Sequence, residues 1–447
     1  MSAPTTEPMP VELALKALDK QLSQPLIAAL EACARCGICA EACHYYRAEP
    51  STQFVPAARG EALRKVYRAE HDFLSRIFPQ WTGAEKLNET TLAKLAEMAF
   101  SQCTLCRRCT FNCPMGVDTP LMMRAVRAMA TASGAAPEML VMLADAAIQK
   151  GEDPSFFREM FVEMMGDLEK ELQEKTGDPD AKITIQRQGA KVLYVPLAGA
   201  HTIVPPAIIF HAAQEDWTLS IFEAANYGVF LADTARAKQI AARIVNEAKE
   251  LGVKEVVLAE CGHAYAALRW EAPNWFGETF PFKVVSLIEK VDQYLAEGRI
   301  TLDPSANTER VTYHDSCNMA RSGGVIEEPR RVLRAAVQDF VEMTPNRQEA
   351  YCCGGGGGLV ALPEYAELRL KAGQPKAQQV RATGAKVVVA ACENCRLQLG
   401  DITQHYGLDV EITALADLVV KAMRLPGKQL EIPSLSGEEK VTVGAGD

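Results

Sequence analysis

The sequence predicts a multidomain fold of the α plus α/β type, in which a helical N-terminal region precedes a duplicated pair of α/β units. Two observations predict this fold. Apolar residues recur at helical spacing up to about residue 187, and from about residue 190 short β-branched runs alternate with helices. In addition, residues 191–194 (KVLY) match residues 310–313 (RVTY), within a repeat that relates the two α/β stretches.

The individual elements follow from these patterns. In the N-terminal region, helices are expected over 11–32, 58–78, 88–103, 119–132 and 136–187. In the α/β region, strands are expected at 191–197, 219–223, 254–260, 310–316, 340–344 and 385–391, with long helices at 234–251 and from 363 to about 382.

These elements divide the 447 residues into five parts. They are a helical domain (1–135), a helical linker that ends in a charged stretch (136–187), a first α/β half (188–300), a second α/β half (301–425) and a polar tail (426–447). The charged stretch is interpreted as a solvated helix face, not as a binding surface.

The charge and hydropathy of the chain exclude two classes of protein. A net charge of −10 argues against nucleic acid as a partner, because phosphate binding needs a basic surface. The sequence contains no run of 18 apolar residues and no recognisable secretion signal at its start. We therefore expect a cytoplasmic protein that reaches the inner membrane only through partner subunits.

Fourteen cysteines dominate the chemistry of the sequence. Disulfides are disfavoured because no secretion signal is visible and because many of the cysteines are adjacent or separated by only two residues. Eight of them form two runs of the type CxxCxxCxxxC, which is the spacing of bacterial ferredoxins. The first run is Cys33, Cys36, Cys39 and Cys43, and the second is Cys103, Cys106, Cys109 and Cys113.

In paired ferredoxin runs, the fourth cysteine of each run binds the cluster of the other run. We therefore assign Cys33, Cys36, Cys39 and Cys113 to one cubane 4Fe-4S cluster, and Cys103, Cys106, Cys109 and Cys43 to a second. Zinc is the alternative for any CxxC pair, but two full runs of identical spacing disfavour it. His44 stands where a proline usually follows the run, and the long helical segment between the runs indicates an α-helical ferredoxin.

A third set of cysteines lies in the second α/β half. It consists of Cys317, Cys352, Cys353, Cys392 and Cys395, with Gly354–Gly358 directly after the adjacent pair. Two adjacent cysteines suit a larger or opened cluster better than one corner of a cubane. The glycines would let the backbone approach a bulky cluster or a substrate, and they do not match a phosphate-binding loop.

The first α/β half keeps only one cysteine, Cys261. On the repeat alignment, Ala198 takes the place of Cys317, Asn226-Tyr227-Gly228 that of Cys352-Cys353-Gly354, and Ala264 that of Cys395. The sequence therefore predicts one metal site in a duplicated pair of halves.

The five-cysteine set resembles the CCG domain of heterodisulfide reductases, and with the two ferredoxin runs the chain resembles the HdrD-like family over about residues 20 to 425. This family includes the DsrK, TmcB and HmcF subunits of membrane redox complexes. The resemblance implies a noncubane 4Fe-4S cluster held by the five cysteines, where a disulfide is cleaved or formed. The gap between Gly354 and Cys392 is slightly longer than is usual in the family.

The single CCG motif favours the DsrK-like branch over the branch that acts on the methanogen heterodisulfide. The resemblance then implies an oxidoreductase acting on a thiol or disulfide, either of a small DsrC-type protein or a heterodisulfide, with a membrane cytochrome b-type subunit among its partners. Two alternatives stay open. One is the iron–sulfur subunit of a flavoprotein dehydrogenase for glycolate or glycerol 3-phosphate, and the other is a pure electron relay.

Cys261 and His263 are the candidate catalytic pair outside the clusters. A helix start and a nearby histidine both lower a thiol pKa, so Cys261 could face the active site with His263 as proton donor. Alternatively, Cys261 is a buried remnant of a lost ligand. His314 and Asp315 are expected to make ordinary hydrogen bonds at a strand end, and Arg321, Arg330 and Arg331 to receive an acidic partner or to be surface charge.

Overall fold

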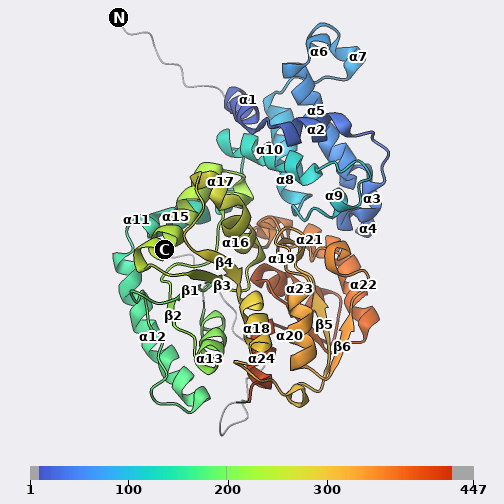
Figure 1. Ribbon diagram of the computed structural model, residues 1–447. Helices are drawn as coiled ribbons and strands as arrows, with labels where there is room; N and C mark the ends of the chain where they lie inside the picture. The colour runs from blue at the N-terminus through green and yellow to red at the C-terminus, as the bar shows by residue number, and fades with distance from the viewer. Residues whose placement is uncertain (1–9, 198, 425–447) are drawn as a thin grey trace, which may run out of the picture.

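The computed structural model describes residues 10–197 and 199–424, so the expected tail (426–447) and Ala198 lie outside the described residues. Ten helices up to residue 132 form the N-terminal helical region in the described part (Figure 1). They are α1 (Pro10–Gln21), α2 (Gln24–Ala32), α3 (Cys39–Ala42), α4 (His44–Ala48), α5 (Pro56–His71), α6 (Phe73–Ile77), α7 (Pro79–Thr82), α8 (Glu89–Ser101), α9 (Arg108–Phe111) and α10 (Thr119–Ala132).

The core of this region is built around α10. Its apolar face, with Met123 and Met129, packs with Leu18 of α1 and Leu95 of α8 in one buried cluster. The single helix expected over 11–32 is divided into α1 and α2, because Pro25 can occupy a first helical turn but cannot continue a helix from the preceding residues.

Two further helices, α11 (Glu138–Glu152) and α12 (Ser155–Thr176), follow the N-terminal region. α11 packs on α15 and α12 on α13, and Phe161, Met165 and Leu172 of α12 belong to the core of the first α/β half. The helix expected to reach residue 187 ends at Thr176, where Gly177 adopts a left-handed conformation with φ 72°.

The first α/β half holds a parallel sheet of four strands in the order β2-β1-β3-β4. The strands are β1 (Val192–Val195), β2 (Trp217–Leu219), β3 (Glu255–Leu258) and β4 (Lys283–Ser286). The helices are α13 (Val204–Ala212), α14 (Gly228–Leu231), α15 (Thr234–Leu251), α16 (Gly262–Ala266), α17 (Ala272–Phe276) and α18 (Leu287–Ala296).

The second α/β half repeats this topology with the order β6-β5-β7-β8, again all parallel. Its strands are β5 (Arg310–His314), β6 (Asp339–Glu342), β7 (Val387–Ala390) and β8 (Glu411–Thr413). Its helices are α19 (Cys317–Ala320), α20 (Glu328–Ala336), α21 (Ala366–Ala372), α22 (Gln374–Thr383), α23 (Glu393–His405) and α24 (Leu415–Ala422).

The structure confirms the class of a helical region with two α/β units and corrects several elements. The edge strands β4 and β8 were not predicted, and the strand expected at 219–223 is wrong except for its first residue, because β2 ends at Leu219. The helix expected from 363 is interrupted at Gly373, whose close packing against Ile402 would not admit a side chain. The helix predicted over 234–251 coincides with α15.

The two α/β halves lie side by side, and the helical region lies across the top of both (Figure 1). Helices α18, α20 and α24 pack between the halves. Glu260, which follows β3, also fastens them, because its carboxylate accepts hydrogen bonds from Arg396 (2.6 Å) and from the backbone N–H of Ala416 (3.0 Å). The loops that carry the cysteines of the second half face the helical region.

Candidate metal centres and active site

The cysteines of the two ferredoxin runs gather into two groups. Cys33, Cys36, Cys39 and Cys113, here called the first group, line one small cavity, and Cys109 reaches its edge. Cys43, Cys103, Cys106 and Cys109, the second group, line another. In each group, three cysteines of one run meet the fourth cysteine of the other run, as crossed ligation requires. The two groups differ in exposure, because Cys36 is exposed whereas Cys43, Cys103 and Cys109 are buried.

The backbone of both runs is shaped in the same way. The residues on either side of the second cysteine of each run have positive φ angles. They are Arg35 (58°) and Gly37 (80°) in the first run, and Leu105 (58°) and Arg107 (62°) in the second. This conformation costs about 1–2 kcal/mol for each non-glycine residue. Successive N–H groups in such turns point inward and form a concavity that suits an anion, and an iron–sulfur cluster with thiolate ligands is an anion.

The five cysteines of the second α/β half form the third group: Cys317, Cys352, Cys353, Cys392 and Cys395. All five are buried. Cys317 begins α19 after strand β5, and Cys392 precedes α23 after strand β7, so the parallel sheet brings these loops to one edge. The sulfur atoms of Cys353 and Cys395 are 3.4 Å apart.

The thiols of the third group are in contact with one another and with the second group. Hydrogen bonds from Cys106 and Cys317 lower the pKa of Cys352, and those from Cys352 and Cys395 lower the pKa of Cys353 well below its ordinary value. The pKa of Cys395 is raised instead, by its hydrogen bonds with Cys353 and Cys392 and by burial. Cys106 of the second group therefore belongs to a continuous series of sulfur atoms that ends in the third group.

Two buried histidines face these sulfur atoms. One ligand atom of His44 lies within 4.8 Å of Cys106 and Cys352, and one of His314 lies within 4.8 Å of Cys353 and Cys395. Nε2 of His44 and both ring nitrogens of His314 are buried without a hydrogen-bond partner. The ordinary strand-end hydrogen bond expected for the His314 side chain is therefore wrong. Gathered free thiols and unpartnered ring nitrogens suit a thiolate-ligated cluster.

The second run packs directly on the third group. Thr104 Oγ1 is 3.4 Å from the sulfur of Cys352, and the Arg321 guanidinium donates to the carbonyl of Cys106 at 2.7 Å. A Cβ atom on Gly356 would lie 3.0 Å from the Thr104 carbonyl oxygen. The glycine run was expected to admit a cluster or a substrate, and in the structure it admits the loop of the second run.

Arg127 ties the three regions together at this point. It is fully buried, and its guanidinium donates to the carbonyls of Cys103 (2.8 Å), Phe230 (2.8 Å) and Gly357 (2.7 Å). These carbonyls belong to the second run, the first α/β half and the glycine run. Arg59 adds a second buried cation, with Nη2 3.3 Å from the sulfur of Cys43. Sequence reasoning missed both, since nothing local distinguishes them from surface arginines.

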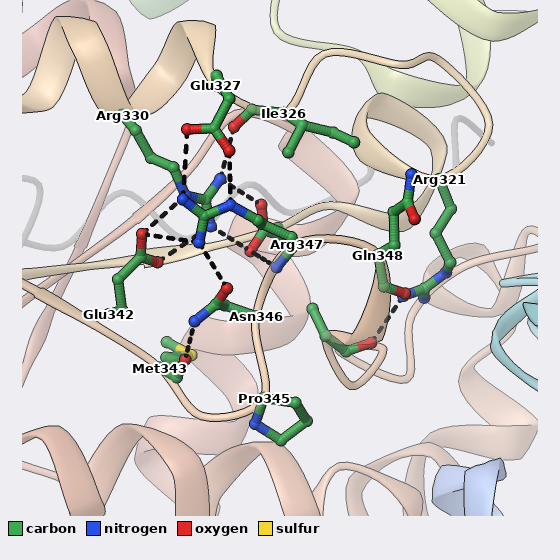
Figure 2. A network of polar contacts seen from close by, with 12 residues as sticks. Arg321, Ile326, Glu327, Arg330, Glu342, Met343, Pro345, Asn346, Arg347 and Gln348 are labelled. Carbon is green, nitrogen blue, oxygen red and sulfur yellow. Dashed lines mark hydrogen bonds and ion pairs between the residues drawn. The ribbon is translucent and has the colours of Figure 1, made fainter. Parts of the chain in front are cut away.

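Arg321 and Arg330 are also internal, so the expectation that they receive a partner or form surface charge is wrong. Figure 2 shows Arg330 within a network that includes Glu342 and Arg347. Arg330 donates to both carboxylate oxygens of Asp315 at 2.8 Å, and Asp315 accepts the Arg347 backbone N–H at 2.6 Å. This network fixes the segment before Cys352 relative to β5. Arg331 is half exposed, and its guanidinium pairs with Asp292.

A cavity of about 320 Å³ opens where the three regions meet. Its lining includes no cysteine, but it includes Thr104, which contacts Cys352, and Asn318, which follows Cys317. Its wall includes Arg107 and Arg124 of the helical region, His263 and Trp270 of the first half, and Asn318 of the second half. Trp270 lies in a π-helical turn, Ala267–Glu271, and its indole N–H donates to the Gly323 carbonyl at 3.2 Å. Such π-helical turns are frequent at functional sites.

Cys261 lies behind His263, with its sulfur 3.3 Å from Nδ1 of the imidazole. Burial raises the pKa of the Cys261 thiol and lowers the pKa of His263 to about 4. Nε2 of His263 accepts the backbone N–H of Asn226 at 3.3 Å, which places the ring proton on Nδ1 toward the sulfur. The effect of burial on the Cys261 thiol pKa is therefore larger than the lowering expected from the helix start. A neutral imidazole faces a protonated thiol.

Comparisons with known proteins agree with this geometry. Residues 29–117 match the family model of the 4Fe-4S dicluster domain, and residues 311–400 match that of the cysteine-rich domain. A protein of Archaeoglobus fulgidus named "Hdr-like menaquinol oxidoreductase iron-sulfur subunit 2" is 29% identical, over 88% of this chain and 80% of its own length.

Two further relatives are similar along most of the chain. One is a subunit of the "Dihydromethanophenazine:CoB--CoM heterodisulfide reductase" of Methanosarcina mazei, which is 25% identical, over 92% of this chain and 98% of its own length. The other is a "Probable membrane-anchored ferredoxin" of Chromohalobacter salexigens, which is 26% identical, over 87% of this chain and 58% of its own length.

The fold and the cysteine groups define an iron–sulfur protein that joins a dicluster domain to a cysteine-rich domain. Its relatives include both reductase and menaquinol oxidoreductase subunits. Over most of its length the chain is similar to iron–sulfur subunits of Hdr-like menaquinol oxidoreductases and of heterodisulfide reductases. In the part of the chain that the structure describes, no helix is both long and apolar enough to cross a membrane.

Proposed function

We propose that this chain is the iron–sulfur subunit of a membrane-associated oxidoreductase, and that it exchanges electrons with a thiol or disulfide at the third group. The observation that carries the proposal is the meeting of three features at one place. The second group contacts the third through Cys106 and Cys352, and the cavity of about 320 Å³ opens at Thr104 and Asn318, which adjoin the third group.

The exposure of the cysteine groups supports an order of the three groups from the surface to the interior of the protein. Cys36 of the first group is exposed, and Ile38 and Met115 beside it are 53% and 61% exposed, so a partner can approach this group closely. The second group is mostly buried, and the third is completely buried. We propose two cubane 4Fe-4S clusters in the first and second groups and one noncubane 4Fe-4S cluster in the third, with the ligands assigned from the sequence.

The cofactors, when bound, would supply one-electron transfer and an iron that accepts a substrate sulfur. The protein would supply the surroundings of the substrate. Arg107 and Arg124 line the cavity, but each pairs with a carboxylate of the same wall, Asp118 at 3.2 Å and Glu271 at 2.6 Å. Trp270 adds an apolar surface. The cavity therefore offers polar and apolar contacts to a small thiol or to the end of a protein chain.

A leaving thiolate needs a proton, and Cys261 and His263 are the candidate donors. Since the pKa of His263 is about 4, the imidazole is neutral near pH 7 and does not carry the proton to be donated. The protonated partner is the Cys261 thiol, 3.3 Å from Nδ1. We propose that the His263 side chain contacts the substrate in the cavity, and that Cys261 holds the orientation of the His263 ring.

Membrane association would depend on partner subunits, including a cytochrome b-type subunit. The names of the relatives support this, since one is a menaquinol oxidoreductase subunit and another a membrane-anchored ferredoxin. Five large apolar side chains are also exposed on α6 and α7, at the end of the helical region away from the α/β halves (Figure 1): Phe73, Leu74, Ile77, Phe78 and Trp81. An exposed cluster of this kind is typical of a contact surface.

The test is electron paramagnetic resonance of the full chain with its clusters, oxidised in the presence of a dithiol. We expect a new paramagnetic signal that requires the dithiol and that the S-methylated dithiol does not produce. If the dithiol changes no signal, the chain is a relay, or serves a dehydrogenase, and the proposal fails.

A further inference from the structure

His44 is the residue at which the first run departs from the second. It follows Cys43 directly, whereas Pro114 follows Cys113 at the equivalent position of the second run. Pro114 lies on the exposed side of the first group. His44 begins helix α4 and is only 3% exposed. The position that faces solvent in one run is thus buried in the other.

The surroundings of His44 explain the difference. A ring nitrogen of His44 and the sulfur atoms of Cys106 and Cys352 all lie within 4.8 Å of one another. Cys106 belongs to the second group and Cys352 to the third, so the imidazole lies at the junction of the two. Pro114 lies instead at the cavity of the first group, and no cysteine of the third group lines that cavity.

The ring is held in place but has an unused polar atom. It packs against Tyr45 with ring centroids 4.6 Å apart, and the Tyr45 hydroxyl donates to the Ser101 carbonyl at 2.8 Å. Nε2 of His44 is buried without a hydrogen-bond partner, which is costly for a purely structural residue. Because one ring nitrogen lies within 4.8 Å of the sulfur atoms of both Cys106 and Cys352, sulfur is the partner available to the buried imidazole.

We propose that His44 donates a ring N–H to sulfur at this junction, and that it thereby links the second and third groups and sets the difference between their reduction potentials. This proposal rests on the proposed function for the presence of clusters in both groups. Hydrogen bonds to cluster sulfur raise a reduction potential, because they stabilise the more negative reduced state. His44 is thus a positioning residue for electron exchange between the groups and not a ligand.

The experiment is a redox titration of the full chain with its clusters, followed by electron paramagnetic resonance, for wild type, His44→Leu, His44→Gln and His44→Pro. Leucine fills the space without a donor, glutamine keeps an N–H, and proline restores the usual residue at a first helical position that tolerates it. His71→Leu is the matched control, since His71 is on the same domain and pairs with Asp19 at 3.2 Å.

We expect His44→Leu and His44→Pro to shift the reduction equilibrium of a cluster in the second or third group about tenfold toward the oxidised form, which is 59 mV for one electron. His44→Gln should shift it less, and the first group and His71→Leu should be unchanged. Histidine labelled with ¹⁵N should give a weak coupling to a cluster in wild type that His44→Leu removes.

Three results would overturn the proposal: unchanged potentials in His44→Leu, a strong coupling of the kind that a directly bound nitrogen gives, or loss of iron from one group in His44→Leu. A shifted potential together with no dithiol-dependent signal would retain the role of His44 and reject only the thiol chemistry.

Discussion

The two α/β halves have the same strand order, but their corresponding loops carry different side chains. After β5 and β7 the second half presents cysteines whose sulfur atoms contact one another. In the first half, Asn226 occupies the place of Cys352 and uses its amide within the protein, with Nδ2 donating to the Ala237 carbonyl at 2.9 Å. The rings of His263 and Phe230 pack together in the same half, with centroids 4.5 Å apart.

The first half contributes contacts with the second half and part of the cavity wall. Glu260 fastens it to the second half through Arg396, and His263 and Trp270 provide one wall of the cavity. A Cβ atom on Gly262 would lie 2.9 Å from the backbone nitrogen of Met319, so α16 approaches the third group closely. The two halves therefore share a strand order but not a set of cysteines, and the cysteine-rich family model matches only the second half.

The largest effect is expected from removing a ligand of the third group. Cys353→Ser should abolish the dithiol-dependent signal and lower thiol turnover by more than the about 100-fold that loss of a residue supporting a ligand can cost. Iron analysis should show loss from one group only, with the signals of the first and second groups intact. Loss of all iron would mean that the three groups do not assemble independently.

A smaller effect is expected from the network that holds the ligand loop. Arg330→Met should lower the free energy of unfolding by about 3–5 kcal/mol, because the buried Asp315 carboxylate loses its partner. The neighbouring Arg331→Met is the control: its side chain is 52% exposed, so the loss should be within about 1 kcal/mol. Denaturant titration of both variants measures this difference, and equal losses would contradict the role given to Arg330.

The smallest effect is expected from the remaining cysteine of the first half. Cys261→Ala should cost about 1 kcal/mol of stability, as a buried substitution without a lost ligand. Iron content and cluster signals should equal those of wild type. Thiol turnover decides the role of the residue: a tenfold decrease with intact clusters would support participation in the reaction, and unchanged turnover would make Cys261 a remnant.

Much of the candidate site could be predicted because ligand spacing is a local property. Each run gathers three of its cysteines within one short loop, and the switch from helical to alternating patterns marked the change of fold near residue 190. The contact of Cys106 with Cys352 joins residues far apart in the sequence and leaves no local signal. The same holds for Arg127, which is buried only because three distant carbonyls surround it.

Edge strands and helix breaks were the weaker part of the prediction. β8 (Glu411–Thr413) has only three residues, too few for an alternating pattern to stand out. Pro25 and Gly373 divide apolar patterns that otherwise continue, and their effect depends on the packing of the neighbouring turns.

The contact between the second run and the third group also has a consequence for biogenesis. The cysteines of the third group are all buried, and Thr104 and Arg321 cover them from the side of the helical region. Iron and sulfide delivered by an assembly scaffold need access to these thiols, so loading must precede the docking of the helical region or require its temporary release. Maturation of this protein is therefore expected to follow an order, from the deepest cluster outward.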